Sequence, residues 1–491
     1  MIENLPCVSN CEVISLDSIP NLTIKDFREC VLKNIKNGCR IVSYFGVSLA
    51  GSVRLYIVLA DQKIGKFIIM TADVEDEYEC LTLECAQAHL FEREIYEQCG
   101  VNPKNHPALK PVRVFSKNLV NKDLKINKVK GEDIHEVAVG PVHAGIIEPG
   151  HFRFQCYGEN VYYLDISLGY QYRGIERALA GGPDKKTMHY IETAAGDSTS
   201  AHGLAYSGAY EALSDCNVSE RAHVLRSIVL ELERLANHTG DLGALANDIA
   251  YLPTASFCGR LRGDFLNLTA LICGNRFGRG MICAGGVLFD IDDALITELL
   301  KRIEIIYRDL ESAVNLLWNT PSVMDFFEGT GVLTKKHCEE LGIVGLPARA
   351  CGVSRDVRSD FPFGNYRLDQ IPVSIHSSGD VLARAYVRWL EIQRSIVFIK
   401  NNLKTLPKGK IQTELNKTIP NSLVVSVVEG FRGEICHTVI TDKKGKFSKY
   451  KIVDASFHNW IGLEMVLRNE QISNFPLCNK SFSLSYCGHD L

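Results

Sequence analysis

A long apolar stripe in the middle of the chain limits the possible folds more than any other feature of the sequence. Asn217 followed three residues later by Glu220 has the pattern of a capping box. Beyond it, apolar residues recur every three or four positions, which is the repeat of one helical face: Val224, Leu225, Ile228, Leu232, Leu235 and Leu242. The pattern predicts one long buried helix that runs from about Ser219 to His238 or beyond.

Other segments of the same half predict a bundle around this helix. Helices are expected around 190–213, 263–276 and 379–403. Near the end of the chain, 423–428 has the composition of a strand, and 435–441 and 447–453 predict a hairpin across Asp442-Lys443-Lys444-Gly445. We therefore expect a long-helix bundle with peripheral β-sheets.

The N-terminal part has a different pattern. Residues 53–60 and 66–71 are rich in β-branched and aromatic residues and predict strands. Residues 81–98 have helical spacing, and Gly100 and Pro103 follow as stop signals. The predicted class is α+β, with a small α+β domain at 1–115 ahead of the bundle at 138–491.

The segment between these two parts is polar and rich in lysine. We predict a solvated linker at 116–137 because few of its residues could join a core.

Composition excludes several classes of protein. Among 491 residues the net charge is only −4, and this argues against a dedicated nucleic-acid-binding protein. No run of 18 or more apolar residues is present, so we expect no transmembrane helix. Acidic and polar residues stand early, at Glu3, Asn4 and Glu12, where a signal peptide would be basic and then apolar. We therefore expect a cytosolic protein that reaches a membrane only through its partners.

Familiar cofactor motifs are missing. The 17 cysteines include no Cys-x-x-Cys pair, so a metal or iron–sulfur site held by this chain alone is not expected. The sequence has no His-Glu-x-x-His and no Gly-x-Gly-x-x-Gly motif. The segment 181–187 hints at a phosphate-binding loop but lacks the glycine before Lys186-Thr187, and we interpret it as a turn.

The segment 91–113 resembles the signature of the small hydrophilic complex I subunit often called the C subunit. In that family a Glu-Arg-Glu-x-Tyr-Asp helix leads through a glycine to a His-Pro-x-Leu loop. The matching residues here are Glu92, Arg93, Glu94, Tyr96, Gly100, His106, Pro107 and Leu109.

The rest of the chain resembles the D subunit of complex I. It is more closely similar to the large subunit of the formate-hydrogenlyase-type, or group 4, [NiFe] hydrogenases, of which hydrogenase-4 component G is an example. The ordered motifs that carry this resemblance are 140–143 with 148–154, 170–177, 231–251, 276–287, 352–366 and 456–468. The resemblance implies a fused C/D-type subunit whose bundle has the fold of a hydrogenase large subunit.

The resemblance also shows what this chain lacks. Active relatives hold nickel and iron with four thiolates in a C-G-x-C and a D-P-C-x-x-C motif. At those four positions the chain has Ala195, Ser198, Ser485 and Gly488. Because such a site requires soft thiolate ligands, we expect no nickel–iron centre. Cys487 lies one position off the ligand spacing and cannot replace them. The chain ends three residues after Gly488, so no extension to be cleaved after metal insertion is expected.

Complex I uses the corresponding cavity for a quinone headgroup, and this chain matches that site only in part. The family's headgroup tyrosine falls on Gly196, whereas its first loop histidine matches His143 and the aspartate after the long helix matches Asp248. The resemblance makes His143 and Asp248 candidates for a quinone-like cavity. The alternatives are a structural hydrogen bond for His143 and a helix-end cap for Asp248.

Three further residues are candidates for a functional or a structural role. Glu192 matches a carboxylate that relays protons in hydrogenases. His202 is expected to pack in the core, and His238 shares a face with Glu231, where a core hydrogen bond between the two is expected.

Arg355 and Arg358 resemble arginines that face the cluster of the partner subunit. A salt bridge to Asp356 or Asp360 is the alternative for these two arginines.

The resemblance implies a peripheral-arm subunit of a membrane-bound NADH dehydrogenase or hydrogenase-4-like oxidoreductase, on the cytoplasmic side of the inner membrane. A complex I B-like iron–sulfur subunit would carry a [4Fe-4S] cluster beside a quinone-like cavity of this chain. Antiporter-like membrane subunits would couple electron transfer to ion translocation, and NAD would bind only through other subunits. The alternatives are a redox-inactive structural or coupling subunit and, less favoured, a true nickel–iron hydrogenase.

Overall fold

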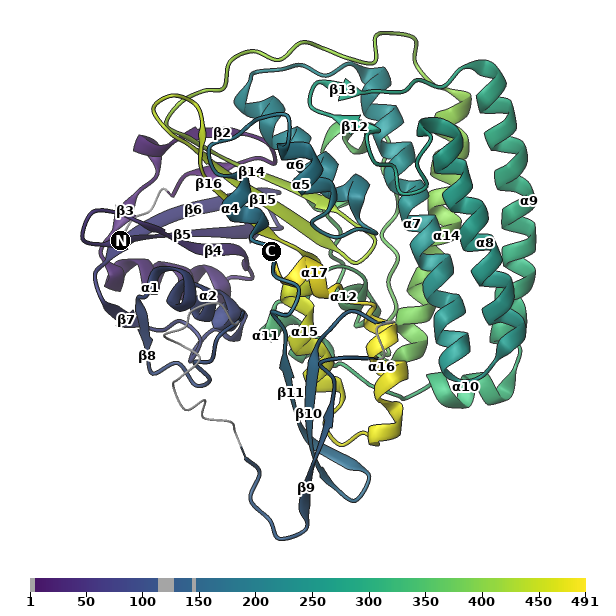
Figure 1. Cartoon of the computed structure of the whole chain (residues 1–491), viewed down its shortest axis with the longest axis horizontal. Coiled ribbons are helices and arrows are strands. Elements are labelled where there is room, and N and C mark those ends of the chain that lie inside the picture. The colour runs from purple at the N-terminus through teal and green to yellow at the C-terminus, as the bar shows by residue number, and fades with distance from the viewer. Residues whose placement is uncertain (1–4, 114–127, 144–146) are drawn as a thin grey trace.

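The computed structural model describes residues 5–113, 128–143 and 147–491. In this part of the chain, a bundle of long helices lies on one side and a sheet-rich N-terminal part lies on the other (Figure 1). Several small sheets accompany the long helices, and this confirms the predicted α+β class.

The N-terminal part is built on a sheet with strand order β1-β6-β5-β4, and the short β3 pairs in parallel with β6. The helices α1 and α2 contact its strands. The bounds are β1 Cys7–Val8, β3 Asn21–Leu22, α1 Ile24–Lys36, β4 Arg40–Ser48, β5 Val53–Asp61, β6 Lys66–Val74 and α2 His89–Cys99. The strands predicted at 53–60 and 66–71 are confirmed.

The helix predicted over 81–98 begins later than expected, at His89. The buried carboxylate of Glu92 accepts hydrogen bonds from the backbone N–H groups of Leu81 and Thr82, at 2.7 and 3.0 Å. This holds 81–85 in a turn ahead of the helix. The predicted end is confirmed, because Gly100 closes the helix in the left-handed region at φ 77°.

Four long helices form the bundle and lie side by side in Figure 1. They are α7 Glu220–Asp248, α8 Leu252–Cys273, α9 Asp293–Trp318 and α14 Val381–Lys404. The predicted stripe of α7 is buried, and burial of one such leucine stabilises a fold by about 1.5–3 kcal/mol. The predicted cap is corrected: Ser219, with extended backbone, accepts from the N–H of Ala222, whereas Asn217 lies outside the helix.

A second sheet joins the two ends of the chain. Its order is β16-β15-β14-β2, so the N-terminal β2 is an edge strand beside a C-terminal hairpin. The bounds are β2 Val13–Ser15, β14 Ser422–Glu429, β15 Glu434–Thr441 and β16 Phe447–Val453, which confirms the predicted hairpin. One hydrophobic core runs from the N-terminal sheet into this second sheet, so the two parts pack as a unit.

A third sheet of β9 Ile134–Val139, β10 His151–Tyr157 and β11 Asn160–Ser167 projects from the body of the molecule (Figure 1). β9 begins inside the segment predicted as a linker, so 134–137 form a strand because their backbone pairs with β10. Residues 116–127 of that segment lie outside the described residues. The boundaries between domains stay predictions.

The helix predicted at 190–213 is two helices, with a break at 193–198. The remaining elements are β7 Glu77–Glu79, β8 Asn102–Lys104, α4 Ile175–Leu179, α5 Thr187–Glu192, α6 Thr199–Leu213, β12 Ile282–Cys283, β13 Gly286–Val287, α10 Pro321–Phe327, α11 Lys335–Leu341, α12 Gly345–Ala350, α13 Val357–Asp360, α15 Ala455–Val466, α16 Phe475–Phe482 and α17 Tyr486–His489.

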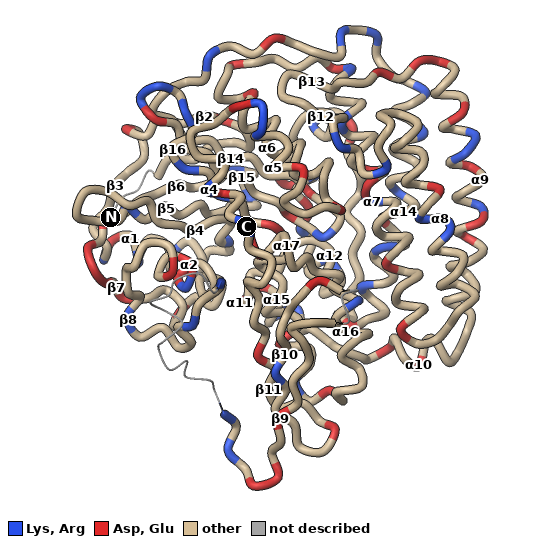
Figure 2. Tube along the Cα trace, in the orientation of Figure 1, with Lys and Arg blue, Asp and Glu red and all other residues tan. Residues whose placement is uncertain are grey.

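Charged residues of both signs are interspersed along the trace (Figure 2). Within the described ranges, none of the helices has both the length and the apolar character needed to cross a membrane.

Candidate functional site

A cavity of about 860 Å³ lies between the C-terminal half of α7, the strands β9 and β10, and the segment around α16 and α17. Part of its lining is apolar and includes aromatic rings, namely Val139, Ile147, Phe152, Phe154, Phe475 and Leu484. Another part is polar, namely Asp197, Asn237, Asp241, Asp248, Arg432 and Lys480. The cavity therefore suits an amphipathic small molecule with an apolar body and a polar end.

Both residues predicted for a headgroup site line this cavity. The Nε2 atom of His143 lies 2.9 Å from the carbonyl oxygen of Gly150, so its ring is held by the hydrogen bond expected of a structural histidine while it still faces the cavity. Asp248 is the last residue of α7, and desolvation raises the pKa of its carboxyl. The fold thus brings together two residues that are 105 positions apart in the sequence.

Two aspartates of the polar part form ion pairs that were not predicted. Arg432 binds Asp197 with two hydrogen bonds of 2.7 Å. Asp241 accepts from Lys480 at 2.8 Å and from Arg388 at 3.0 Å. Burial alone would raise the pKa of Asp241, but the two cations outweigh it and hold the pKa well below its usual range.

The four positions that hold nickel and iron in active relatives offer no thiolate. Ala195 is fully buried, and the hydroxyl of Ser198 accepts from Arg432 at 3.2 Å. The hydroxyl of Ser485 accepts from the N–H of Gly488 at 2.9 Å. A Cβ atom at 488 would stand 2.9 Å from the Cγ atom of Asp454. These residues do not fit a nickel–iron group.

Within the residues that the structure describes, no group of three or more His, Cys, Asp or Glu side chains is placed to hold a metal ion. His489 near the second motif is instead bound to Asp490, at 2.8 Å between Nδ1 and Oδ1.

Asp454, beside Gly488, begins a buried chain of hydrogen bonds through His202. Burial would raise the pKa of Asp454, but its hydrogen bond to His202 and nearby Arg432 bring the pKa to about 2. The ionised carboxylate must accept from His202 Nε2 at 3.3 Å. For neutral rings, His202 Nδ1 then accepts from His437 Nε2 at 3.1 Å, and His437 Nδ1 accepts from the Tyr450 hydroxyl at 2.8 Å. His202 therefore lies in the core, as a bonded and not a purely packing residue.

Glu192 lies away from the cavity wall. Its side chain is 6% exposed, and its carboxylate accepts from the N–H of Gly280 at 2.6 Å. The structure does not bring it into contact with His143 or Asp248, and its proton-relay role stays a prediction.

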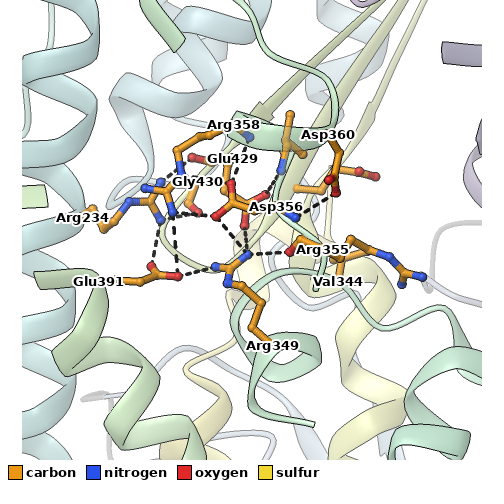
Figure 3. Close-up of polar contacts among 12 residues, drawn as sticks. Arg234, Val344, Arg349, Arg355, Asp356, Arg358, Asp360, Glu391, Glu429 and Gly430 are labelled. Atoms are coloured by element: carbon orange, nitrogen blue, oxygen red, sulfur yellow. Dashed lines mark hydrogen bonds and ion pairs between the residues drawn. The ribbon is translucent and has the colours of Figure 1, made fainter. Parts of the chain in front are cut away.

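Arg358 and Arg355 point to different surroundings (Figure 3). Arg358 is buried and bonds to Asp356 at 2.7 Å and to Glu231 at 3.2 Å, which is the salt bridge weighed as its alternative. Arg355 donates to the carbonyl of Ile343 at 3.0 Å, outside that group of ion pairs. The cluster-facing role predicted for both arginines stays a prediction.

The predicted hydrogen bond between His238 and Glu231 is not present, so this prediction is wrong. Seven residues are two helical turns, about 10 Å along the axis, which is too far for a hydrogen bond. His238 Nε2 instead lies 2.8 Å from a carboxylate oxygen of Glu391 on the neighbouring α14. Glu231 is bound by Arg234 and by the hydroxyls of Tyr366 and Ser395.

One pattern in the sequence could have predicted that the buried polar residues of α7 have partners on a neighbouring helix. On α7, residues 227, 231, 234, 238 and 241 are polar and repeat every three or four positions, on a buried face. A polar stripe buried along a bundle helix predicts partners on the helix packed against it, and here that helix is α14.

Comparison with known proteins finds relatives of this chain. Residues 248–422 match the family model of the respiratory-chain NADH dehydrogenase 49 kDa subunit. Formate hydrogenlyase subunit 5 of Escherichia coli is 28% identical over 469 residues, which are 89% of this chain and 82% of that protein.

Two other relatives represent the hydrogenase and complex I branches. Hydrogenase-4 component G of Escherichia coli is 28% identical, over 72% of this chain and 61% of that protein. NADH-quinone oxidoreductase subunit 4 of Thermus thermophilus is 27% identical, over 69% of this chain and 90% of that protein. The α+β fold agrees with these matches. Over residues 248–422 the chain is thus similar to the NADH dehydrogenase 49 kDa subunit, and over most of its length it is similar to formate hydrogenlyase subunit 5, which supports the family that the motifs predicted.

Proposed function

We propose that this chain is a peripheral subunit of a membrane-bound complex I-like or hydrogenase-4-like oxidoreductase, and that its cavity takes a quinone-like electron acceptor. The observation that carries the proposal is the cavity of about 860 Å³ that His143 and Asp248 both line, together with apolar and aromatic side chains. An apolar wall would hold the body of the acceptor, and the polar groups would bind its carbonyl oxygens.

Electrons would come from outside the chain. A B-like iron–sulfur partner would carry a [4Fe-4S] cluster next to the cavity, and NAD would be oxidised in another subunit. Reduction of a quinone to a hydroquinone takes up two electrons and two protons, and membrane subunits related to antiporters would couple this to ion translocation. In such a reaction the chain contributes binding, orientation and local charge.

The chain's own residues suit this task without a metal. His143 and Asp248 would hydrogen-bond the acceptor at its polar end. The ion pairs Arg432–Asp197 and Lys480–Asp241 would keep that end polar without leaving an unpaired charge beside a neutral ligand.

The test is quinone reduction by the purified complex, with metal analysis of the same sample. We expect iron without nickel, and quinone reductase activity that falls at least tenfold in His143→Ala and Asp248→Asn, about 1.4 kcal/mol in the transition state. The matched controls are His135→Ala on the exposed face of β9 and Asp264→Asn on α8, both outside the cavity lining. Full activity in both cavity variants contradicts the proposal.

A redox-inactive coupling subunit is the second candidate. The observation that favours it is the loss of catalytic groups at both places where relatives do chemistry: no thiolate at the four metal positions, and Gly196 where the headgroup tyrosine would stand. A complex that keeps its membrane partners but contains neither iron nor quinone reductase activity supports this candidate.

A further inference from the structure

A cluster of buried ions, none of which lines the cavity, contains unequal numbers of positive and negative groups. It contains three guanidinium groups, Arg234, Arg349 and Arg358, and four carboxylates, Glu231, Asp356, Glu391 and Glu429. None of the seven residues is more than 3% exposed. Figure 3 shows the arginines and most of the carboxylates directed toward one another. With all groups ionised, the described cluster has one negative charge too many.

An unbalanced charge in this position is costly. Moving an ion out of water costs several kcal/mol unless an opposite charge compensates it, so buried acids tend to bind a proton instead. We infer that this cluster binds one exchangeable proton, and that the proton resides on Glu429.

Hydrogen bonds identify the carboxylate. Glu231 receives bonds from two arginines and from the hydroxyls of Tyr366 and Ser395, and Glu391 receives bonds from Arg234, Arg349 and His238. Both oxygens of Asp356 are held by the guanidinium of Arg358.

Glu429 has the weakest support of the four. It receives one bond from Arg349, at 2.7 Å, and one from the backbone N–H of Val357, at 3.0 Å. The carboxylate with the fewest donors is the one least stabilised as an anion, so it protonates first.

The pKa values agree with this assignment. Burial, together with the negative charge of Asp356, raises the pKa of Glu429 from 4.5 to about 7 against the opposing arginines. Burial lowers the pKa of His238, which therefore does not supply the missing positive charge. The charged and titratable groups that face Glu429 come from four elements: Arg234, Glu231 and His238 on α7, Arg349 on α12, Asp356 and Arg358 at α13, and Glu391 on α14.

The proton site is close to the cavity along the chain. Glu429 ends β14, and three residues later Arg432 lines the cavity and binds Asp197. His238, which is bound to Glu391 of the cluster, has its ring 6.1 Å from that of Phe431. Negative charge gained by an acceptor would raise the proton affinity of Glu429, which would take up a proton from water to form a neutral carboxylic acid. This coupling rests on the proposed function, whereas the bound proton does not.

Two isosteric variants of the full chain test the proton. Glu429→Gln imitates the protonated acid, so we expect its Tm within about 2 °C of the native value at pH 7. Glu391→Gln removes a charge that the arginines need, and we expect its Tm to fall by about 5 °C or more. Equal losses in the two variants would overturn the inference.

The pH dependence of the Tm tests the bound proton independently. The folded chain keeps the Glu429 proton up to about pH 7, whereas the unfolded chain releases it near pH 4.5. The Tm of the native chain should therefore fall as the pH rises from about 4.5 to about 7. Glu429→Gln should lack this part of the slope. If Glu391→Gln does not fold, an infrared difference spectrum decides, because the buried carboxyl of Glu233, with a pKa raised by burial to about 8, also contributes a C=O band at pH 6. The native spectrum minus that of Glu429→Gln should contain the C=O band of one protonated carboxyl. A difference spectrum without that band contradicts the assignment to Glu429.

The coupling needs the assembled complex. With a pH indicator, the native complex should take up more protons per acceptor reduced than the Glu429→Gln complex at pH 8, where Glu429 starts ionised. Equal uptake, with acceptor reduced by both, rules out the coupling and leaves the proposed function intact. If the native complex does not reduce the acceptor, the proposed function is wrong. The stability and infrared measurements still test the bound proton in that case.

Discussion

The residue at position 488 shows how closely packed the chain is at the positions matched to nickel-ligand cysteines. Gly488 lies in the short helix α17, and a Cβ atom there would come within 3.0 Å of the Asp454 carboxylate and the Ser485 hydroxyl. A thiolate therefore cannot be restored at this position without displacing Asp454, whose other oxygen is bound by His202.

We predict that Gly488→Ala lowers the free energy of unfolding by about 1–3 kcal/mol because the added methyl group overpacks this position. The matched control is Gly259→Ala on α8, where a Cβ atom meets nothing within 4 Å. That change should be neutral or stabilise by about 0.5–1 kcal/mol, since alanine favours a helix. Urea unfolding measures both, and equal effects would contradict the packing argument.

Asp454 makes a second prediction at this scale. Its pKa is about 2 in the folded chain and 3.8 ordinarily, so its stabilising contribution is complete above pH 3.8 and lost as the pH falls toward 2. Asp454→Asn should cost about 2 kcal/mol at pH 7, and the difference from the native chain should shrink as the pH falls from 4 to 3. Urea titrations at these pH values check it. A difference that stays constant with pH would show that charge is not the cause.

At the scale of elements, the start of α7 distinguishes two caps that the sequence leaves close together. Ser219 has the extended backbone of a cap and accepts from Ala222, and its hydroxyl also donates to the carbonyl of Lys410. We predict that Ser219→Ala costs about 1 kcal/mol, whereas Asn217→Ala has almost no effect. Chemical denaturation of the two variants tests the corrected cap, and a larger loss for Asn217→Ala would restore the original assignment.

The seam between α7 and α14 is unusual for two bundle helices because it is polar along much of its length. Asp241 with Arg388, and His238 with Glu391, occupy places where apolar side chains would ordinarily pack. Each ion is buried but paired, so the seam fixes how the two helices align more than it adds stability.

At the scale of the whole molecule, the edge strand β2 joins the first residues of the chain to the last sheet. Val13–Ser15 pair with 422–424, and Cys11 and Leu16 add backbone bonds to Val425 and Asn421. These bonds attach the N-terminal part to β14, the strand that ends at Glu429.

We predict that deletion of residues 1–18 exposes the edge of β14. Hydrogen exchange at 422–425 should become faster by at least tenfold, while the amides of β15 at 436–440, paired on both sides, should keep their protection. Mass spectrometry of the exchanged chain measures both segments. Unchanged exchange at 422–425 would mean that β2 does not protect this edge.

Much of this protein follows from its sequence because the signals are local or carried by ordered motifs. The α7 stripe, the stop at Gly100, the β15–β16 hairpin and the family were all predicted, since periodicity and turn residues act over a few positions. The absence of thiolates at 195, 198, 485 and 488 is likewise a property of the sequence alone.

Tertiary structure alone decided which distant residues became partners. Glu391 rather than Glu231 binds His238, β2 pairs with β14, and Lys480 binds Asp241. The uneven charge of the cluster around Glu429 also appears only when four elements pack together. The physical reason is that a buried ion takes its partner from whichever helix or strand packs against it, and that choice depends on packing over the whole chain.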